Sequence, residues 1–474
     1  MLLFFSAGCS HSMGPTPQGG FSNASLDGTY SFSFSGTDAN GRVAVAGMLA
    51  ADGAGKISKG MLDINQQGSA ASNGTFTGTY TIAADGRGTA TLSASAGNFT
   101  LAFVVVSSSR ALVIRFEQAA TGTGAMDLVN SSAFSTTALS GTLVFNLSGL
   151  DASAKPLATV GSITTDATGT VTSGVQDTSD NGSIVTAQPI SAGTLQVAST
   201  GRGTASITTA AGPLNFVFYV VDANHIKLVE TDKLPALAGD AFRQTGPISN
   251  ASLTGPFAFT AGGTDTANGS SLGGAFATGA VLTTDGAGTI SSGSADINDA
   301  GSPTTNIAIT GTYALDASGR GTATLSSTTA GSLNFVIYPT VNGVQLLDVD
   351  SGRVVSGAAF AQTGTPFTNA VLRGTYALSF SETQDLGAVD VNAALAFDGI
   401  GRINGLTDIN ALGSVSTGTS MTGTFVMDQS GHGSMLLESG LGPQNMAIYT
   451  VSGSRCLFIG VDSGTVVIGD IESN

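Results

Sequence analysis

Apolar and polar residues alternate along short runs through most of this chain. In Thr89-Ala90-Thr91-Leu92 the alanine and the leucine share one face and the threonines the other, which is the period of a β-strand. Val, Ile, Phe and Thr fill these runs, turn residues separate them, and none has a helical period. The pattern predicts an all-β protein.

The pattern is written four times. Each copy opens on Leu-x-Gly, at Leu26, Leu139, Leu253 and Leu372. These openings lie about 113 to 119 residues apart, too far for solenoid repeats of about 20–50 residues. We therefore expect a leader and tether over residues 1–21, followed by four domains over 22–135, 136–248, 249–367 and 368–474.

About eight strands per copy, joined by tight turns, predict antiparallel up-and-down sheets. Eight such strands close into a small barrel with no exposed edges, and a two-sheet sandwich is the alternative. The first copy places Phe32, Phe34, Phe99, Phe103 and Phe116 in its strands. If these rings point inward, a barrel of this size is filled.

A Gly-Arg-Gly phrase marks one hairpin turn in three copies, at Arg87, Arg202 and Arg320, and His432 takes the arginine's place in the fourth. Asp-Gly supports the positive φ of tight turns, and we expect the second glycine to supply a bulge. Because copy four has a histidine, we expect no common chemical role for this side chain. The predicted turn residues are Asp52, Gly53, Asp85, Gly86, Gly88, Asp285, Gly286, Gly319, Gly321, Asp398 and Gly399.

An Asp-Ile-Asn motif recurs in three copies. Aspartate and asparagine two apart share one face of a strand, and the isoleucine between them faces the core. The polar pair either hydrogen-bonds turn amides or forms a repeated ligand or ion contact at the barrel rim. Copy two departs from the motif with Asp177-Thr178-Ser179-Asp180. The candidate contact residues are Asp63, Asn65, Asp296, Asn298, Asp408 and Asn410.

The formal net charge is −16, and the 16 Lys and Arg residues form no cluster. Such a chain is repelled by nucleic acid and by anionic lipid. The histidines have no nucleophile motif beside them, so we expect no enzyme, no cofactor and no metal. The one titratable cluster confined to a single copy is Asp222, His225, Glu230 and Asp232, and it keeps a hydrolase open as the least favoured alternative.

The chain begins MLLFFSAGCS, and Ser6-Ala7-Gly8-Cys9 resembles the lipobox of bacterial lipoproteins. The resemblance implies secretion across the inner membrane and a lipid on Cys9. That lipid would be the only membrane contact, in the outer membrane or at the cell surface. The second cysteine, Cys456, stands in an apolar run and is expected to be a buried core thiol.

The tandem units resemble uncharacterised Gly/Thr-rich bacterial envelope lipoproteins with repeated β-domains, which implies a location and no activity. Lipocalins and avidins are similar in architecture, but this chain has no Trp. We predict a monomeric, non-enzymatic envelope or secreted lipoprotein that serves as a multivalent binding or structural module, with an envelope or extracellular partner. A carrier with one apolar-ligand cavity per barrel is the alternative.

Overall fold

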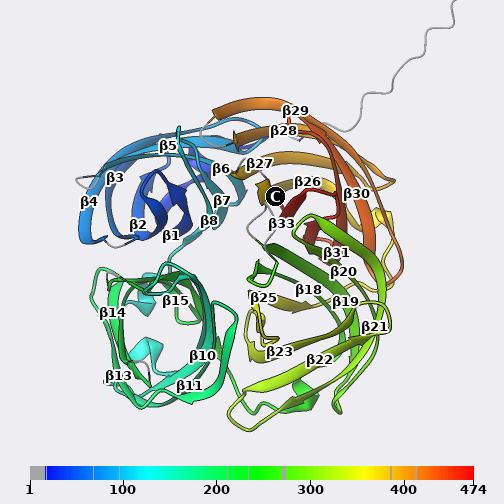
Figure 1. Ribbon diagram of the computed structural model, residues 1–474. Helices are drawn as coiled ribbons and strands as arrows, with labels where there is room; N and C mark the ends of the chain where they lie inside the picture. The colour runs from blue at the N-terminus through cyan, green and yellow to red at the C-terminus, as the bar shows by residue number, and fades with distance from the viewer. Residues whose placement is uncertain are drawn as a thin grey trace, which may run out of the picture.

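The computed structural model describes residues 17, 19–67, 69–94, 97–210, 212–232, 234–268, 274–384, 387–411 and 414–474. Cys9 and most of the predicted tether lie outside the described residues. The described chain forms four antiparallel sheets, here called units 1 to 4 (Figure 1). The predicted all-β class with four tandem up-and-down domains is confirmed.

Units 1 and 2 contain the first half of the strands. Unit 1 consists of β1 (Asp27–Asp38), β2 (Gly41–Asp52), β3 (Lys56–Gln66), β4 (Ser69–Ile82), β5 (Arg87–Ala94), β6 (Gly97–Ser107), β7 (Arg110–Arg115) and β8 (Ala120–Leu128). Unit 2 consists of β9 (Gly141–Leu150), β10 (Pro156–Thr165), β11 (Val171–Asp180), β12 (Ser183–Pro189), β13 (Ala192–Val197), β14 (Arg202–Thr209), β15 (Gly212–Asp222), β16 (His225–Glu230) and β17 (Ala236–Gln244).

Units 3 and 4 contain the second half. Unit 3 consists of β18 (Thr254–Asp265), β19 (Ala275–Asp285), β20 (Thr289–Asp299), β21 (Ser302–Leu315), β22 (Gly321–Ser327), β23 (Gly331–Thr340), β24 (Gly343–Asp348) and β25 (Arg353–Ala361). Unit 4 consists of β26 (Arg373–Gln384), β27 (Gly387–Asp398), β28 (Arg402–Ala411), β29 (Ser414–Met427), β30 (His432–Ser439), β31 (Gly442–Ser452), β32 (Arg455–Gly460) and β33 (Thr465–Ser473).

Short 3₁₀ turns precede the first strand of each unit. They are η1 (Asn23–Ser25), η2 (Ser131–Ala133), η3 (Thr137–Leu139), η4 (Asn250–Ser252) and η5 (Asn369–Val371). Tyr80 and Tyr313 help to fix two of these entrances, because their hydroxyls donate to the carbonyls of Leu26 and Leu253 at 2.7 and 2.8 Å.

Units 1, 3 and 4 are closed eight-stranded barrels, in which the last strand pairs with the first. Unit 2 is a nine-stranded sheet because its fourth strand is broken into β12 and β13. Pro189, which has no amide hydrogen to donate, ends β12, and an isolated bridge joins Thr170 to Thr194 across the break.

The unit interiors are packed with aromatic and aliphatic side chains. In unit 1, Phe32, Phe34, Phe99 and Phe103 are all at most 5% exposed and belong to one cluster. The interior cavities of units 3 and 2 measure only ≈ 60 and ≈ 20 Å³, far below the ~300 Å³ of a small-molecule site. The expectation of filled barrels holds for these interiors.

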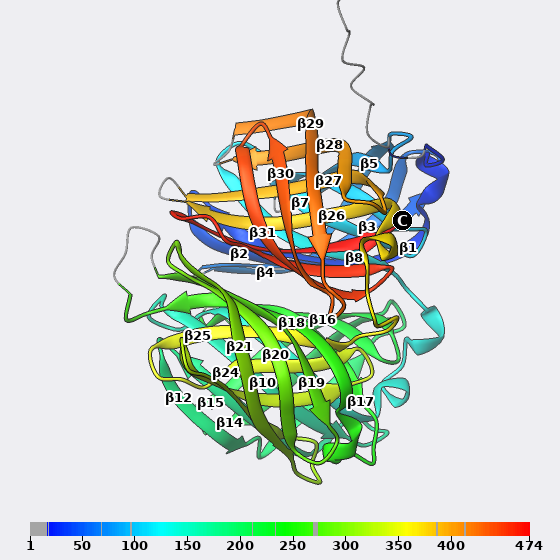
Figure 2. The same ribbon diagram turned by 90° about the vertical axis from the view of Figure 1, so that its right-hand side faces the viewer.

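The outer faces of the units are apolar where the units meet. Along β6, Phe103 and Val105 face the unit 1 core, whereas Val104 and Val106 pack against Ala377 of unit 4. Similar clusters join unit 1 to 2, unit 2 to 3 and unit 3 to 4. The four units therefore close into a ring around a central axis (Figure 1), and the side view shows units 1 and 4 above units 2 and 3 (Figure 2).

Candidate functional site

One aspartate of each unit, the first residue of Asp-Ile-Asn in units 1, 3 and 4 and Asp177 in unit 2, is bound by a residue of the next unit. At the junction of units 1 and 2, Arg202 donates from Nε and Nη2 to Asp63 at 2.9 Å each, and the Tyr219 hydroxyl donates at 2.5 Å. The backbone N–H of Asn73, a positive-φ residue of β4, donates to the same carboxylate at 2.8 Å. Asp63 is 0% exposed, so burial, charge and three donors hold it in one position.

The same contact closes the other three junctions. Asp177 binds Arg320 at 2.6 and 2.9 Å and Tyr338 at 2.5 Å, and Asp408 accepts from Arg87 at 2.7 Å. At the junction of units 3 and 4, Nε2 of His432 lies 2.7 Å from Asp296. The Gly-Arg-Gly phrase and the aspartate are thus two halves of one junction, used four times around the ring.

This arrangement corrects two expectations. His432 does share the role of Arg87, Arg202 and Arg320, because its ring nitrogen occupies the place of the guanidinium. The second glycine does not supply a bulge: Gly88 pairs in regular register with Phe103. A side chain there would overlap the Phe103 ring, as at Gly203 against Phe218, so the glycine allows a close approach.

The motif asparagines also reach into the next unit. Asn65 donates to the carbonyls of Glu230 and Asp232 at 2.9 and 3.1 Å, and Asn298 and Asn410 bind carbonyls of units 4 and 1 in the same way. In unit 2, which lacks the asparagine, Ser179 donates to a unit 3 carbonyl. The candidate contact residues are therefore placed at buried junctions with partners from within the chain.

The predicted turn aspartates bind the amides of their own turns. Asp52 Oδ1 accepts from the N–H groups of Ala54 and Lys56 at 2.8 and 2.9 Å. These hydrogen bonds lower the pKa of Asp52, and the same turn lowers that of Asp285. Five of the predicted turn glycines have positive φ: Gly53, Gly86, Gly286, Gly319 and Gly399. Asp85 and Asp398 accept hydrogen bonds from backbone amides of their own turns. Gly321 is the first residue of strand β22.

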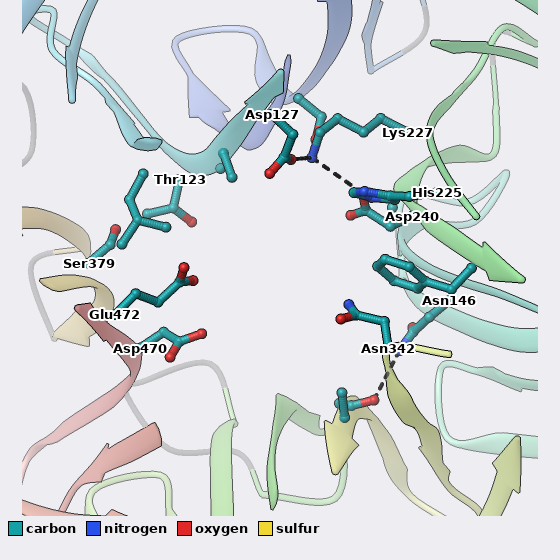
Figure 3. A pocket seen from close by; sticks show the side chains of 18 of the residues that line it. Thr123, Asp127, Asn146, His225, Lys227, Asp240, Asn342, Ser379, Asp470 and Glu472 are labelled. Atoms are coloured by element: carbon teal, nitrogen blue, oxygen red, sulfur yellow. Dashed lines mark hydrogen bonds and ion pairs between the residues drawn. The ribbon is translucent and has the colours of Figure 1, made fainter. Parts of the chain in front are cut away.

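A cavity of ≈ 930 Å³ lies on the ring axis, and all four units line it. Figure 3 shows polar side chains converging on it: Asp127 from β8, Lys227 from β16, Asp240 from β17, and Asp470 and Glu472 from β33. Sequence reasoning missed this site, because its residues are spread from unit 1 to the end of unit 4.

A chain of ion pairs runs along the cavity wall. Arg110 of unit 1 binds Glu472 of unit 4 through two hydrogen bonds of 2.7 and 2.9 Å and binds Asp127 at 2.7 Å. Lys227 of unit 2 lies 2.9 Å from Asp127 and 3.4 Å from Asp240. Units 4, 1 and 2 are thus joined by one continuous network of opposite charges.

The network sets the protonation of its members. Burial alone would raise the pKa of Asp127, but Lys227 and Arg110 hold it at about 2. Burial opposes the charge of Lys227, and Asp240 and Asp127 nevertheless raise its pKa. Asp470 differs: burial raises its pKa, opposed by Arg455.

Equivalent positions differ among the units at this wall. The first residues of β7, β16, β24 and β32 are Arg110, His225, Gly343 and Arg455. Unit 3 lines the cavity with neutral side chains such as Asn342, Gln345 and Phe360. The junctions repeat nearly unchanged around the ring, whereas the axis-facing wall carries arginine in units 1 and 4, histidine in unit 2 and glycine in unit 3 at this position.

The titratable cluster predicted in copy two is divided. His225 and Asp222 line the cavity, with His225 Nε2 2.7 Å from Asp240. Glu230 stands at the other end of the six-residue strand β16. Burial and the neighbouring Asp232 raise the pKa of Glu230 to about 9. The structure does not bring these four residues into one catalytic arrangement.

Among the residues that the structure describes, no group of three or more His, Cys, Asp or Glu side chains is placed to hold a metal ion. Nor do these described residues include a helix with the length and hydropathy needed to cross a membrane. Cys456 is 0% exposed and unpaired by any disulfide, as expected of a core thiol, and burial raises its pKa to about 12.

Comparisons with known proteins give weak likenesses. No protein-family model matches the chain, and no curated protein matches it. Among solved structures, a double mutant of the vaccine antigen transferrin binding protein B from Haemophilus parasuis Hp5 is 10% identical, with a TM-score of 0.20, covering 77% of this chain and 83% of that one. The isotype 1 protein from serogroup B Neisseria meningitidis is 10% identical, with a TM-score of 0.19, covering 77% and 84%. Such TM-scores carry no inference about fold or function.

Proposed function

We propose that this chain is a non-enzymatic binding protein of the bacterial cell envelope, anchored through a lipid on Cys9. It acts as a monomer and binds an envelope or extracellular molecule at one composite site on the ring axis. The four units are not four equal binding modules, because the aspartate that recurs in every copy binds a side chain of the neighbouring unit.

One observation carries this proposal: the four copies are alike at their junctions and unlike at the central wall. A ring that served only as a scaffold needs its junctions and cores. It has no need for Arg110, His225 and Arg455 at equivalent positions of three units beside Gly343 in the fourth. Ligand sites combine an apolar lining with a few placed polar or charged groups that provide specificity, and this cavity contains both.

The carrier alternative loses its support in units 2 and 3. Their interior cavities of ≈ 20 and ≈ 60 Å³ hold about one or two waters at most, by the ~30 Å³ that each occupies in the liquid. The cavity between the units is the larger space by more than ten-fold, and charged and polar side chains share its wall with apolar ones.

Anchoring is tested by expressing the whole chain in a bacterium fed a labelled fatty acid. We expect label and membrane association in the wild type and their loss in Cys9→Ser, while Cys456→Ser keeps both. An unlabelled, fully soluble wild type would reject the lipid anchor.

The closed ring of four units is tested by small-angle X-ray scattering of full-length Cys9→Ser protein. A closed ring gives a compact particle with a central hollow. Four separate domains on short linkers would give an extended, flexible particle, and that profile would reject the composite site.

A further inference from the structure

We infer that the central cavity binds an uncharged, polyhydroxylated ligand, namely a short oligosaccharide. The inference rests on the proposed function, since it names the ligand class of the composite site. It follows from three properties of the wall: its size, the pairing of its charges, and the mixture of donors and acceptors that it presents.

The first property is size. At ≈ 930 Å³ the cavity lies near the top of the ~300–1,000 Å³ range of small-molecule sites. All four units line it, so that a bound molecule can be contacted from several sides (Figure 3). An elongated ligand of a few rings fits this space better than a single ion or a single small metabolite.

The second property is that the charges of the wall already have partners. Arg110 is held by Asp127 and Glu472, and Lys227 by Asp127 and Asp240. Arg455 binds Asp470 at 2.5 Å, and Asp222, the last residue of β15, accepts from the backbone N–H of Asn224 at 2.6 Å. A ligand with a net charge would have to separate one of these pairs, or be desolvated without a countercharge, and both are costly.

The third property is that these groups are paired yet not saturated. A carboxylate offers about four lone-pair sites and a guanidinium five N–H donors. The side chains of Asp240 and Arg110 remain 34% and 32% exposed, and those of Arg455 and Asp470 27% and 24%. Acceptors and donors therefore alternate along the wall, and a hydroxyl, which donates and accepts at once, satisfies both.

Unit 3 completes the wall with groups that suit a sugar. Its cavity face carries the amides of Asn342 and Gln345, and Asn146 of unit 2 donates to Gln345 at 3.2 Å. Phe360 of unit 3 and Phe242 of unit 2 are half-buried at the cavity, the first beneath Arg455 at 4.0 Å and the second stacked on His225 at 4.5 Å. Amides bind ring hydroxyls, and aromatic carbon contacts the apolar C–H face of a pyranose.

The test uses the full-length Cys9→Ser protein and titration calorimetry with maltotriose, cellotriose and triacetylchitotriose. Trigalacturonate and spermine serve as anionic and cationic comparators. We expect at least one neutral trisaccharide to bind and neither charged comparator to do so.

Cavity variants place the site. We expect Asp470→Asn and Asn342→Ala each to weaken trisaccharide binding by about ten-fold, the effect of losing one hydrogen bond to a charged or well-placed polar group. Glu438→Gln, on the exposed outer face of unit 4, is the matched control and should change affinity less than two-fold. Asn342 is exposed and outside the ion network, so its variant keeps the ring folded.

The outcomes separate the ligand class from the site. Binding of spermine or trigalacturonate that Asp470→Asn abolishes would overturn the neutral sugar and keep the composite cavity. Trisaccharide binding that neither cavity variant alters would overturn the cavity as the site, and with it the proposed function. No binding by any of the three neutral trisaccharides would overturn the inference.

Discussion

Replacing Asp63 by alanine tests the central claim that the repeated motif holds neighbouring units together. The carboxylate is 0% exposed and is bound by two guanidinium N–H groups, one tyrosine hydroxyl and one backbone amide. Removing it leaves Tyr219 without its hydroxyl's acceptor and Arg202 with an uncompensated charge at the junction of units 1 and 2.

The size of the effect follows from those lost partners. Breaking a buried ion pair by removing one member costs about 3–5 kcal/mol. Arg202 keeps 20% exposure of its side chain, so water relieves part of that cost. We expect a loss of about 3 kcal/mol in the free energy of separating units 1 and 2, and little change within the unit 1 core, whose side chains point the other way.

Native-state hydrogen exchange measures this locally, which suits a chain of four units that is not expected to unfold in two states. The amide of Asn130 donates across the junction to Val221 at 2.7 Å, and that of Thr363 crosses the junction of units 3 and 4 to Val451 at 2.9 Å. Asp63→Ala should raise the exchange of Asn130 about 100-fold, as ~3 kcal/mol implies. The Thr363 amide should be unaffected.

A double-mutant cycle with Arg202→Ala identifies the interaction. We expect a coupling of about 2 kcal/mol between the two sites, because each single variant already removes the pair. Glu438→Ala is the exposed control. If Asp63→Ala costs less than about 1 kcal/mol, or if the coupling falls below about 0.5 kcal/mol, the motif is not what holds the junction.

Three further predictions concern single residues. Glu230→Gln should stabilise the protein by about 1–3 kcal/mol at pH 8, measured by thermal unfolding. Burial raises the folded-state pKa of Glu230 to about 9, so the folded wild type binds more protons than the unfolded chain and loses stability as the pH rises from about 4 towards 9. The variant cannot titrate at this position and lacks that loss. His432→Ala should raise the exchange of the Thr363 amide, which crosses the junction of units 3 and 4, by about ten-fold, because the buried Asp296 carboxylate loses the ring nitrogen that lies 2.7 Å away; unchanged exchange would refute this. Gly203→Val should lower stability by about 3 kcal/mol, because the new side chain overlaps the Phe218 ring; a variant as stable as the wild type would contradict the packing role.

The strands and their fourfold repetition were predictable because they are local. Alternation over a few residues specifies a strand, and a turn such as Asp52-Gly53 specifies a hairpin through its own hydrogen bonds. The break in unit 2 was not predicted, although Pro189 ends β12, because a proline is also compatible with the edge of an intact strand.

The ring itself was not predictable from these patterns alone. Its signal lies in runs such as β6, where Val104 and Val106 are apolar on the face that points away from the barrel core. An apolar run of this kind is equally typical of a strand that is buried on both faces within a single domain. The partner of Asp63 is Arg202, in another copy, and no local pattern joins two residues that far apart. The substitution of Arg by His432 argued against a shared role only because the aspartate opposite was unknown.

The junction of units 4 and 1 differs from the other three because no linker connects it. The contacts between units must close it alone, against the chain entropy of bringing distant segments together. It has the smallest apolar cluster of the four, with five buried residues, and it compensates with polar contacts. Asn392 and Asn410 donate to unit 1 carbonyls, and Arg110 binds Glu472 through two hydrogen bonds.

Arg110 therefore has two structural roles. It closes the ring through Glu472, and through Asp127 it joins the network that lines the central cavity. The cavity wall is continuous only while units 4 and 1 stay in contact, so the site exists only in the closed ring. Because the contacts are reciprocal, a ligand that binds this wall must favour closure by the same free energy by which closure favours the ligand. The untethered junction and the composite site are consequently coupled, and a variant that weakens closure of the ring must also weaken binding of the ligand at the wall.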